Sequence, residues 1–153
     1  MNRPFDGSEP RPDCLFCRIA AGEEPSHCVL DEPSVLGFLD VRPLFVGHVL
    51  VVPREHRETL ADLPAHLVEP LFSRVQAVAV AVERALGCAG SFVAINNRVS
   101  QSVPHLHVHV VPRNRKDGLR GFFWPRTRYD DDAHAEAVAA SIRAALEPAD
   151  GHA

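Results

Sequence analysis

The segment Gln101-Ser-Val-Pro-His-Leu-His-Val-His-Val-Val-Pro-Arg113 decides the fold. Its three histidines, His105, His107 and His109, alternate with apolar residues, and strict alternation with β-branched residues is typical of a strand. Because strand side chains point to opposite faces with a period of two, we expect all three imidazoles on one face, roughly 6.5 Å from one to the next. We expect the opposite, apolar face of this strand to be buried.

Three imidazoles on one face indicate either metal ligation or acid–base and nucleophilic chemistry, because imidazole titrates near neutral pH. Gln101 and Ser102 come just before the strand, where their side chains can hydrogen-bond a bound oxyanion. The alternative is a solvated edge strand that happens to be rich in histidine. Such a strand more often carries Lys, Glu or Thr at its polar positions, so we favour a functional site.

Length and composition exclude several classes of protein. A chain of 153 residues fits one domain with a substantial core, and 46% hydrophobic with 24% charged residues is ordinary for a globular protein. The net charge of −4 argues against a nucleic-acid partner. The sequence contains no run of ~18 apolar residues, so we expect no membrane span. The N-terminus also lacks the apolar core of a signal peptide. We expect a cytoplasmic protein, in which four cysteines more often bind metal or stay inert than form disulfides.

The order of the predicted elements indicates an α+β domain with a mainly antiparallel sheet. We expect strands over residues 27–30, 35–39, 48–52 and 91–95 and through the histidine segment. A long helix is predicted from residues 62–64 to Leu86, with an apolar stripe of Leu67, Leu71, Val75, Val78, Val82 and Leu86. The last two strands form an antiparallel hairpin, and acidic residues 130–132 cap a final helix that ends near Leu146.

We expect a single domain over residues 14–147 that includes a C-terminal extension. Residues 1–13 are predicted to be a mobile tail, and residues 148–153 a frayed one. The basic, aromatic segment 114–129 can pack on the core, cover the site or meet a second subunit, and the sequence does not choose among these roles.

The histidine segment resembles a known family. His105-Leu-His-Val-His-Val-Val111 is similar to the pattern of the histidine triad (HIT) proteins, which are nucleotide hydrolases and transferases. Further matching pieces occur upstream in the same order: Cys14-Leu-Phe-Cys17, Phe38-Leu-Asp40, Gly47-His-Val-Leu-Val-Val-Pro-Arg-Glu-His56 and Asn96-Asn97. The resemblance implies a HIT-like fold with one long helix and a C-terminal helix, and it points to the zinc-binding, bacterial-type branch.

The resemblance implies a structural zinc ion held by Cys14, Cys17, His56 and His105, with one ion per chain and no organic cofactor. A Cys₂His₂ set is closed, which marks a structural site without an open position for water. From the residues alone, two other interpretations stay open. Cys14 and Cys17 also fit a buried pair of small residues, and His56 also fits an ordinary surface position.

For the chemistry, the resemblance implies that His107 attacks the α-phosphate of a nucleotide and forms a covalent nucleotidyl-histidine. It implies that His109 holds the phosphate or the leaving group and that His48 lies beside them. Asp40 would bind the ribose hydroxyls, although an Asp at a strand end can also simply cap a turn.

Neutral donors to the phosphate are expected from Asn97, Gln101 and Ser102. Here the loop between Asn and Gln is about three residues shorter than is usual in the family and contains no glycine. The sequence therefore leaves open whether Asn96 or Asn97 contacts phosphate.

The implied substrate is a conjugate of a purine nucleotide, adenosine or guanosine, whose leaving group the sequence does not identify. The resemblance also implies a homodimer formed through the long helix and the last strand of the hairpin. We weigh two alternatives: a metal-dependent hydrolase with all three histidines on one catalytic zinc, and a nucleotide-binding module without turnover.

Overall fold

The computed structural model describes residues 9–119 and 127–146. The chain divides into two compact units, residues 1–117 and 118–153. The predicted tails, and the segment around the only Trp, lie wholly or largely outside the described residues. None of the described helices combines the length and the apolar character that crossing a membrane requires.

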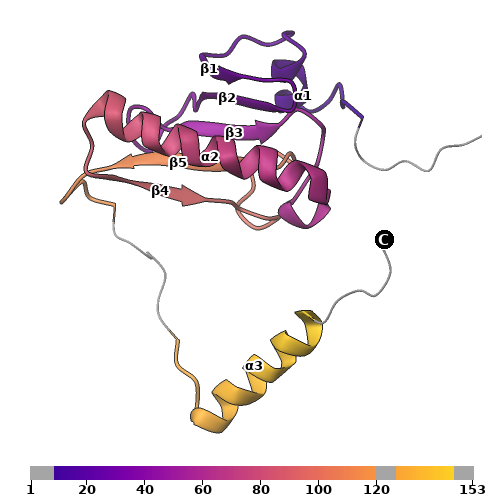
Figure 1. Cartoon of the computed structure of the whole chain (residues 1–153), viewed down its shortest axis with the longest axis vertical. Helices are drawn as coiled ribbons and strands as arrows, with labels where there is room; N and C mark the ends of the chain where they lie inside the picture. The colour runs from indigo at the N-terminus through magenta and orange to yellow at the C-terminus, as the bar shows by residue number, and fades with distance from the viewer. Residues whose placement is uncertain (1–8, 120–126, 147–153) are drawn as a thin grey trace, which may run out of the picture. The chain divides into compact units, whose positions relative to one another are not determined.

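The first unit is built on one five-stranded antiparallel sheet with the strand order β1-β2-β3-β5-β4 (Figure 1). The strands are β1 (Cys28–Asp31), β2 (Val35–Leu39), β3 (Val49–Pro53), β4 (Gly90–Ala94) and β5 (Val108–Arg113). Consecutive strands pair directly except at β3, which pairs with β5 in the register Val49↔Val110. The predicted α+β class with an antiparallel sheet is confirmed.

Helix α2 (Ala65–Leu86) lies across one face of this sheet (Figure 1). Its predicted apolar stripe is buried except for Leu86, which is half exposed. The stripe packs on the β-branched residues Val49, Val51, Val108 and Val110. The helix ends at Gly87, whose φ of 61° lies in the left-handed region that glycine adopts without strain.

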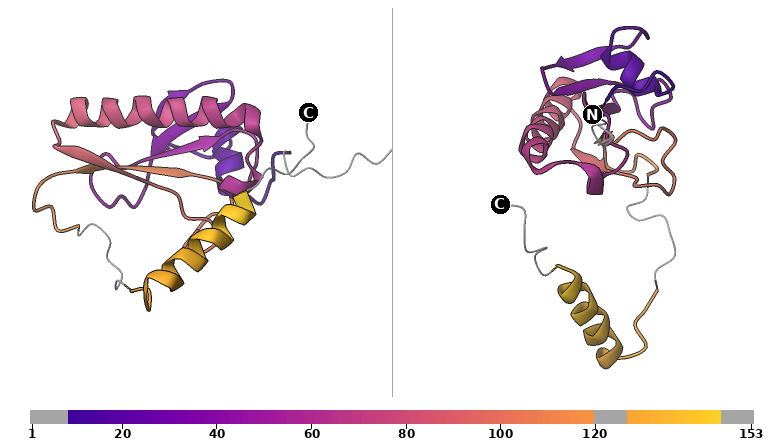
Figure 2. Two further views of the ribbon diagram at one scale, coloured as in Figure 1. Left: turned by 60° about the horizontal axis from the view of Figure 1, so that its bottom comes forward. Right: turned by 90° about the vertical axis from the view of Figure 1, so that its right-hand side faces the viewer.

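The short helix α1 (Leu15–Ala20) covers part of the opposite face (Figure 2). It contributes Phe16 and Cys17 to a second apolar cluster, together with Cys14 and the β2 and β3 side chains Leu36, Phe38, Leu50 and Val52. The sheet is therefore covered by α2 on one side and by α1 on the other. This second core partly buries the face of the sheet that carries His105, His107 and His109.

The histidine strand begins later than the alternation predicts. β5 starts at Val108, so His105 and His107 lie just before the regular ladder. The reason lies in the neighbouring strand, since Pro53 has no N–H for the ladder and its carbonyl accepts a hydrogen bond from the His105 ring at 2.8 Å. The alternation itself holds, because Leu106, Val108 and Val110 are fully buried on the α2 side.

The second unit contains helix α3 (Asp132–Leu146), which is the predicted final helix. Its first turn is capped by Asp131, whose carboxylate accepts the His134 backbone N–H at 2.7 Å. None of its residues is buried.

Candidate active site and metal centre

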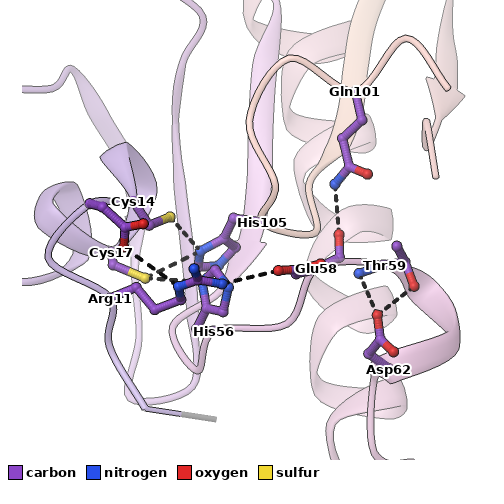
Figure 3. Close-up of polar contacts among 10 residues, drawn as sticks. Arg11, Cys14, Cys17, His56, Glu58, Thr59, Asp62, Gln101 and His105 are labelled. Atoms are coloured by element: carbon purple, nitrogen blue, oxygen red, sulfur yellow. Dashed lines mark hydrogen bonds and ion pairs between the residues drawn. The ribbon is translucent and has the colours of Figure 1, made fainter. Parts of the chain in front are cut away.

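Four predicted metal ligands from distant parts of the chain meet beneath α1. Figure 3 shows Cys14 and Cys17 turned toward His56 and His105. The Nδ1 atom of His105 lies 3.5 Å from each of the two sulfurs, and the Nδ1 atom of His56 lies 3.3 Å from the Cys17 sulfur. All four side chains are buried, and one donor atom from each lies within 4.8 Å of the others.

The protonation states in this cluster suit a metal ion. Because a carbonyl can only accept, the His105 Nε2–H donates to Pro53 and leaves the Nδ1 lone pair facing the sulfurs. Burial lowers the pKa of His105 to about 4 and also lowers the pKa of His56, so both rings are neutral near pH 7. Burial raises the pKa of the Cys17 thiol to about 11, so metal binding has to displace its proton.

The spacing of the donors also fits zinc. With a Zn–S bond of about 2.3 Å and a Zn–N bond of about 2.0 Å, tetrahedral coordination separates sulfur and nitrogen by about 3.5 Å. The observed separations of 3.3 and 3.5 Å match this value. Among the described residues the His56 Nε2 atom is buried without a hydrogen-bond partner. A metal bond at Nδ1 would give this otherwise poorly satisfied ring a strong partner.

The two ring nitrogens of His107 have different surroundings, because only Nδ1 is engaged by the backbone. Its Nδ1–H donates to the His105 backbone carbonyl at 2.7 Å, so Nε2 carries the lone pair. The side chain is buried, with only 3% of it exposed. Phe16 packs against the ring at nearly a right angle, with centroids 5.3 Å apart and an interplanar angle of 88°.

His48 and His109 form a hydrogen-bonded pair next to His107. The Leu44 backbone N–H donates to His48 Nδ1 at 3.2 Å, so the His48 proton sits on Nε2 and is donated to His109 Nδ1 at 2.9 Å. Burial lowers the pKa of both rings, that of His109 to about 4. Neutral His109 therefore carries its own proton on Nε2, and its ring centroid lies 4.9 Å from that of His107.

His107 and His109 line an open cleft. One wall is apolar and is formed by Leu15, Phe16, Ile19, Phe38 and Leu50. Asp40 and Ser102 also line the cleft, so polar groups stand beside the two histidines. Asp40 already accepts the Arg42 backbone N–H at 2.8 Å through one carboxylate oxygen, and its other oxygen lies 3.7 Å from His48 Nδ1.

Two predicted phosphate donors lie elsewhere. The Asn97 side-chain oxygen accepts the Leu60 backbone N–H at 2.8 Å, and Gln101 donates to the Glu58 carbonyl at 2.6 Å (Figure 3). Neither residue lines the cleft. Both attach the loop between them to the segment before α2, and this loop contains Arg98 and Ser100 at positive φ.

Two features of the site escape sequence reasoning. Leu44 acts through its backbone amide, which no side-chain pattern reveals. Phe16 lies inside the Cys-x-x-Cys motif, which draws attention to the sulfurs and not to the residue between them. The only sequence feature that pointed to Phe16 is that it is a large apolar residue next to a predicted metal ligand.

The three triad rings do not share one centre. His105 belongs with the cysteines, while His109 groups with Asp40 and His48. The alternative of a single catalytic zinc on all three histidines therefore has no common ligand geometry in the described part of the chain.

A family model for the HIT domain matches residues 21–116, which is more than half of the chain. The chain belongs to the HIT family. The resemblance inferred from the motifs is thus confirmed. The matched region contains Asp40, His48 and the complete histidine segment, whereas Cys14 and Cys17 precede it.

Two curated HIT relatives carry enzyme names. The adenylylsulfatase HINT3 of Arabidopsis thaliana is 34% identical over 109 residues, which are 70% of this chain and 55% of that protein. The adenosine 5′-monophosphoramidase HNT1 of Candida albicans is 27% identical over 125 residues, which are 78% of this chain and 82% of that protein.

Solved structures show the same fold. SMU.412c from Streptococcus mutans has a TM-score of 0.83 at 33% identity and covers 95% of this chain and 92% of its own. A Zn-bound histidine triad family protein from Mycobacterium smegmatis has a TM-score of 0.67 at 34% identity, covering 87% of this chain and 97% of its own. The HIT fold inferred from the sequence is thereby confirmed.

Proposed function

We propose that this HIT protein is a hydrolase or nucleotidyl transferase that cleaves purine nucleotide conjugates at the α-phosphate through a covalent His107 intermediate. The observation that carries the proposal is the fixed tautomer of His107. Its Nδ1–H is held by a backbone carbonyl, so the lone pair of the neutral ring is on Nε2, in a side chain that lines the cleft.

In the first step His107 Nε2 attacks the α-phosphorus, a P–N bond forms, and the bond from phosphorus to the leaving group breaks. In the second step water attacks the same phosphorus, the P–N bond breaks, and the nucleotide monophosphate is released with His107 restored. An alcohol or amine in place of water gives nucleotidyl transfer. Splitting the reaction in this way predicts ping-pong kinetics.

Charge that builds on the phosphate oxygens needs donors that are already in place. His109 supplies a neutral Nε2–H, because its Nδ1 atom is occupied by His48. Ser102 lines the same cleft and adds a hydroxyl donor. Neither Asn97 nor Gln101 lines the cleft, and both side chains bond backbone groups of the segment before α2. We therefore assign the larger share of phosphate binding to His109 and Ser102.

The rest of the cleft suits a nucleoside. Asp40 has one carboxylate oxygen engaged by Arg42 and a second one available to accept from ribose hydroxyls. The apolar wall that contains Phe16 and Phe38 offers aromatic and aliphatic surface to a base. The names of the adenylylsulfatase and the adenosine phosphoramidase support an adenosine conjugate as the first substrate to test.

We also propose that the Cys14, Cys17, His56 and His105 cluster holds one structural zinc ion. The closed ligand set, the burial of all four residues and the Zn-bound relative support this assignment. The ion organises the protein and takes no part in bond making, so catalysis rests on His107 itself. The free thiols are typical of the reducing cytoplasm, where we place the protein.

A homodimer completes the proposal, formed through α2 and the edge strand β4, because β5, the last strand of the hairpin, lies between β3 and β4 inside the sheet. Val68, Phe72 and Val80 of α2 are each about two-fifths exposed. Val93 is similarly exposed on β4, which is an edge strand with one unpaired side. Sedimentation that shows only monomer at micromolar concentration would remove the dimer from this proposal.

The test is a substrate panel with purified protein. We expect cleavage of an adenosine phosphoramidate or of a diadenosine polyphosphate, with AMP as a product in either case. A nucleotide-binding module would bind AMP and turn over nothing. Activity that persists in metal-free, folded protein excludes a catalytic role for zinc.

A further inference from the structure

Helix α1 belongs to two sites at once. Cys14 lies at its N-terminal boundary and Cys17 within it, so the helix carries half of the metal cluster. Leu15, Phe16 and Ile19 of the same helix line the cleft. One short element therefore contributes side chains to both a metal site and a substrate site.

Phe16 is the link between these sites. It packs edge-on against the His107 ring at 5.3 Å and 88°, and against the His105 ring at 6.0 Å and 65°. On its other side it meets Phe38 at 5.3 Å and 68°. Edge-to-face contacts of this kind favour one relative ring orientation. His107 is thus held by two constraints, the backbone carbonyl at Nδ1 and the perpendicular contact with the Phe16 ring.

Helix α1 cannot hold this position by itself. A helix of six residues lies far below the length at which isolated helices are stable in water. Its N-terminal boundary lacks a side-chain cap. Its C-terminal end is anchored by Arg54, which donates from Nη1 to the Ala20 carbonyl at 2.8 Å. The N-terminal end is tied to the sheet by apolar packing and by the two cysteines that face His56 and His105.

We propose that metal bound by Cys14, Cys17, His56 and His105 sets the nucleotide affinity of the cleft by holding α1 in place, with Phe16 as the positioning residue for His107. The inference rests on the proposed nucleotide function and adds a dependence of substrate binding on the metal. Loss of the metal frees the N-terminal half of α1, which removes the apolar wall and the edge contact on His107 together.

Three measurements on the full chain test this coupling. The first is the Kd for AMP of the zinc-loaded protein and of the protein freed of metal with a chelator. The second is hydrogen exchange of residues 11–24 relative to β3 and β5. The third is the tautomer of His107, read from the ¹⁵N shifts of its ring nitrogens.

We expect the metal-free protein to bind AMP about tenfold or more weakly, to lose protection in α1 while β3 and β5 stay protected, and to show a mixture of His107 tautomers. Added zinc should reverse all three changes. Equal AMP affinity in both forms with α1 still protected would overturn the coupling and leave the nucleotide function standing. No AMP binding even with zinc bound would overturn the nucleotide function and this inference with it.

Phe16→Leu separates the contact from the metal. In zinc-loaded Phe16→Leu protein we expect full zinc content, weaker AMP binding and a mixed His107 tautomer, because the ring edge is lost while most of the apolar volume remains. Cys28→Ser is the matched control, since this exposed cysteine lies outside the cluster and should leave all readouts unchanged. Loss of protection across β3 and β5 in metal-free protein, or a wild-type tautomer in Phe16→Leu, would overturn the proposal.

Discussion

His48 Nε2 lies 2.9 Å from His109 Nδ1, and the Leu44 amide at 3.2 Å from His48 Nδ1 decides which of the two rings donates. The chain of donors runs from the Leu44 backbone through His48 to His109. It leaves a neutral His109 with a single N–H, at Nε2. We therefore expect His48 to act by orienting His109.

Two substitutions of His48 separate these functions. His48→Asn keeps an acceptor for the Leu44 amide but loses the donor to His109, while His48→Gln places an amide N–H near the former Nε2. We expect kcat to fall at least about tenfold in His48→Asn and to recover in part in His48→Gln, as for other supporting partners of a functional histidine. Steady-state kinetics on an adenosine phosphoramidate gives the comparison, and equal losses in both variants would refute the orienting role.

The lowered pKa values predict acid sensitivity. Burial lowers the pKa of folded His109 to about 4 from an ordinary 6.5, and that of His48 in the same direction. Between these pH values the unfolded chain binds protons that the folded protein does not. The free energy of unfolding therefore falls as the pH falls from 6.5 to about 4, and these groups do not change it above pH 6.5. For His109 the full loss is at most about 3 kcal/mol.

Urea unfolding between pH 7.5 and 4.5 measures this loss. His109→Asn should show a shallower decline, because the amide still accepts from His48 but does not titrate. A decline of equal steepness in the variant would assign the acid sensitivity to other groups.

Zinc should copurify at about one ion per chain, as a closed four-ligand site predicts. Cys17→Ser should lower the metal content and reduce the melting temperature by roughly 10 °C, because a ligand at 1,000 times its Kd stabilises by about 4 kcal/mol. Metal analysis and calorimetry provide the two numbers, with exposed Cys28→Ser as the control. Unchanged metal content in Cys17→Ser would show that the site is wrongly assigned.

Much of the fold follows from local patterns in the sequence. The alternation at 105–111 predicts that Leu106, Val108 and Val110 are buried, because every second residue of a strand faces the same side. The apolar stripe from Leu67 to Val82 predicts α2, because residues three or four apart face the same side of a helix. The start of β5 does not follow from the alternation, because the ladder ends at Val51↔Val108, before Pro53 of the neighbouring strand.

The site was less predictable where side chains bond to distant backbone. Asn97 and Gln101 have partners 37 and 43 residues away, in a segment without a recognisable pattern. The burial of His107 depends on α1 folding over it, and alternation within one strand contains no information about what covers that strand.

Asp40→Asn tests the ribose contact. The amide oxygen can still accept the Arg42 N–H, so the turn should persist, while one charged acceptor for the ribose hydroxyls is lost. We expect AMP binding to weaken by about 1–3 kcal/mol and binding of 2′,3′-dideoxy-AMP to change little. Calorimetric titration of both nucleotides gives the comparison. An equal loss for both would mark Asp40 as a turn cap alone.

His107→Asn is the sharpest test of the chemistry. The Asn amide can still donate to the His105 carbonyl, so this variant keeps the backbone contact that Ala would lose and leaves a smaller gap beneath Phe16. We expect turnover to be abolished while zinc content and melting temperature stay close to those of the wild type. AMP binding should survive, because Asp40, Ser102 and His109 are unchanged.

Wild-type protein quenched during turnover of a labelled nucleotide should carry acid-labile, base-stable label on His107, as a phosphorus–nitrogen bond does. His107→Asn should carry none, and His109→Asn should still be labelled at a reduced rate, because it retains the nucleophile and lacks only a donor to the phosphate. Turnover that persists in His107→Asn would rule out covalent catalysis. It would leave attack by water, oriented by the His48–His109 pair, as the mechanism that this cleft supports.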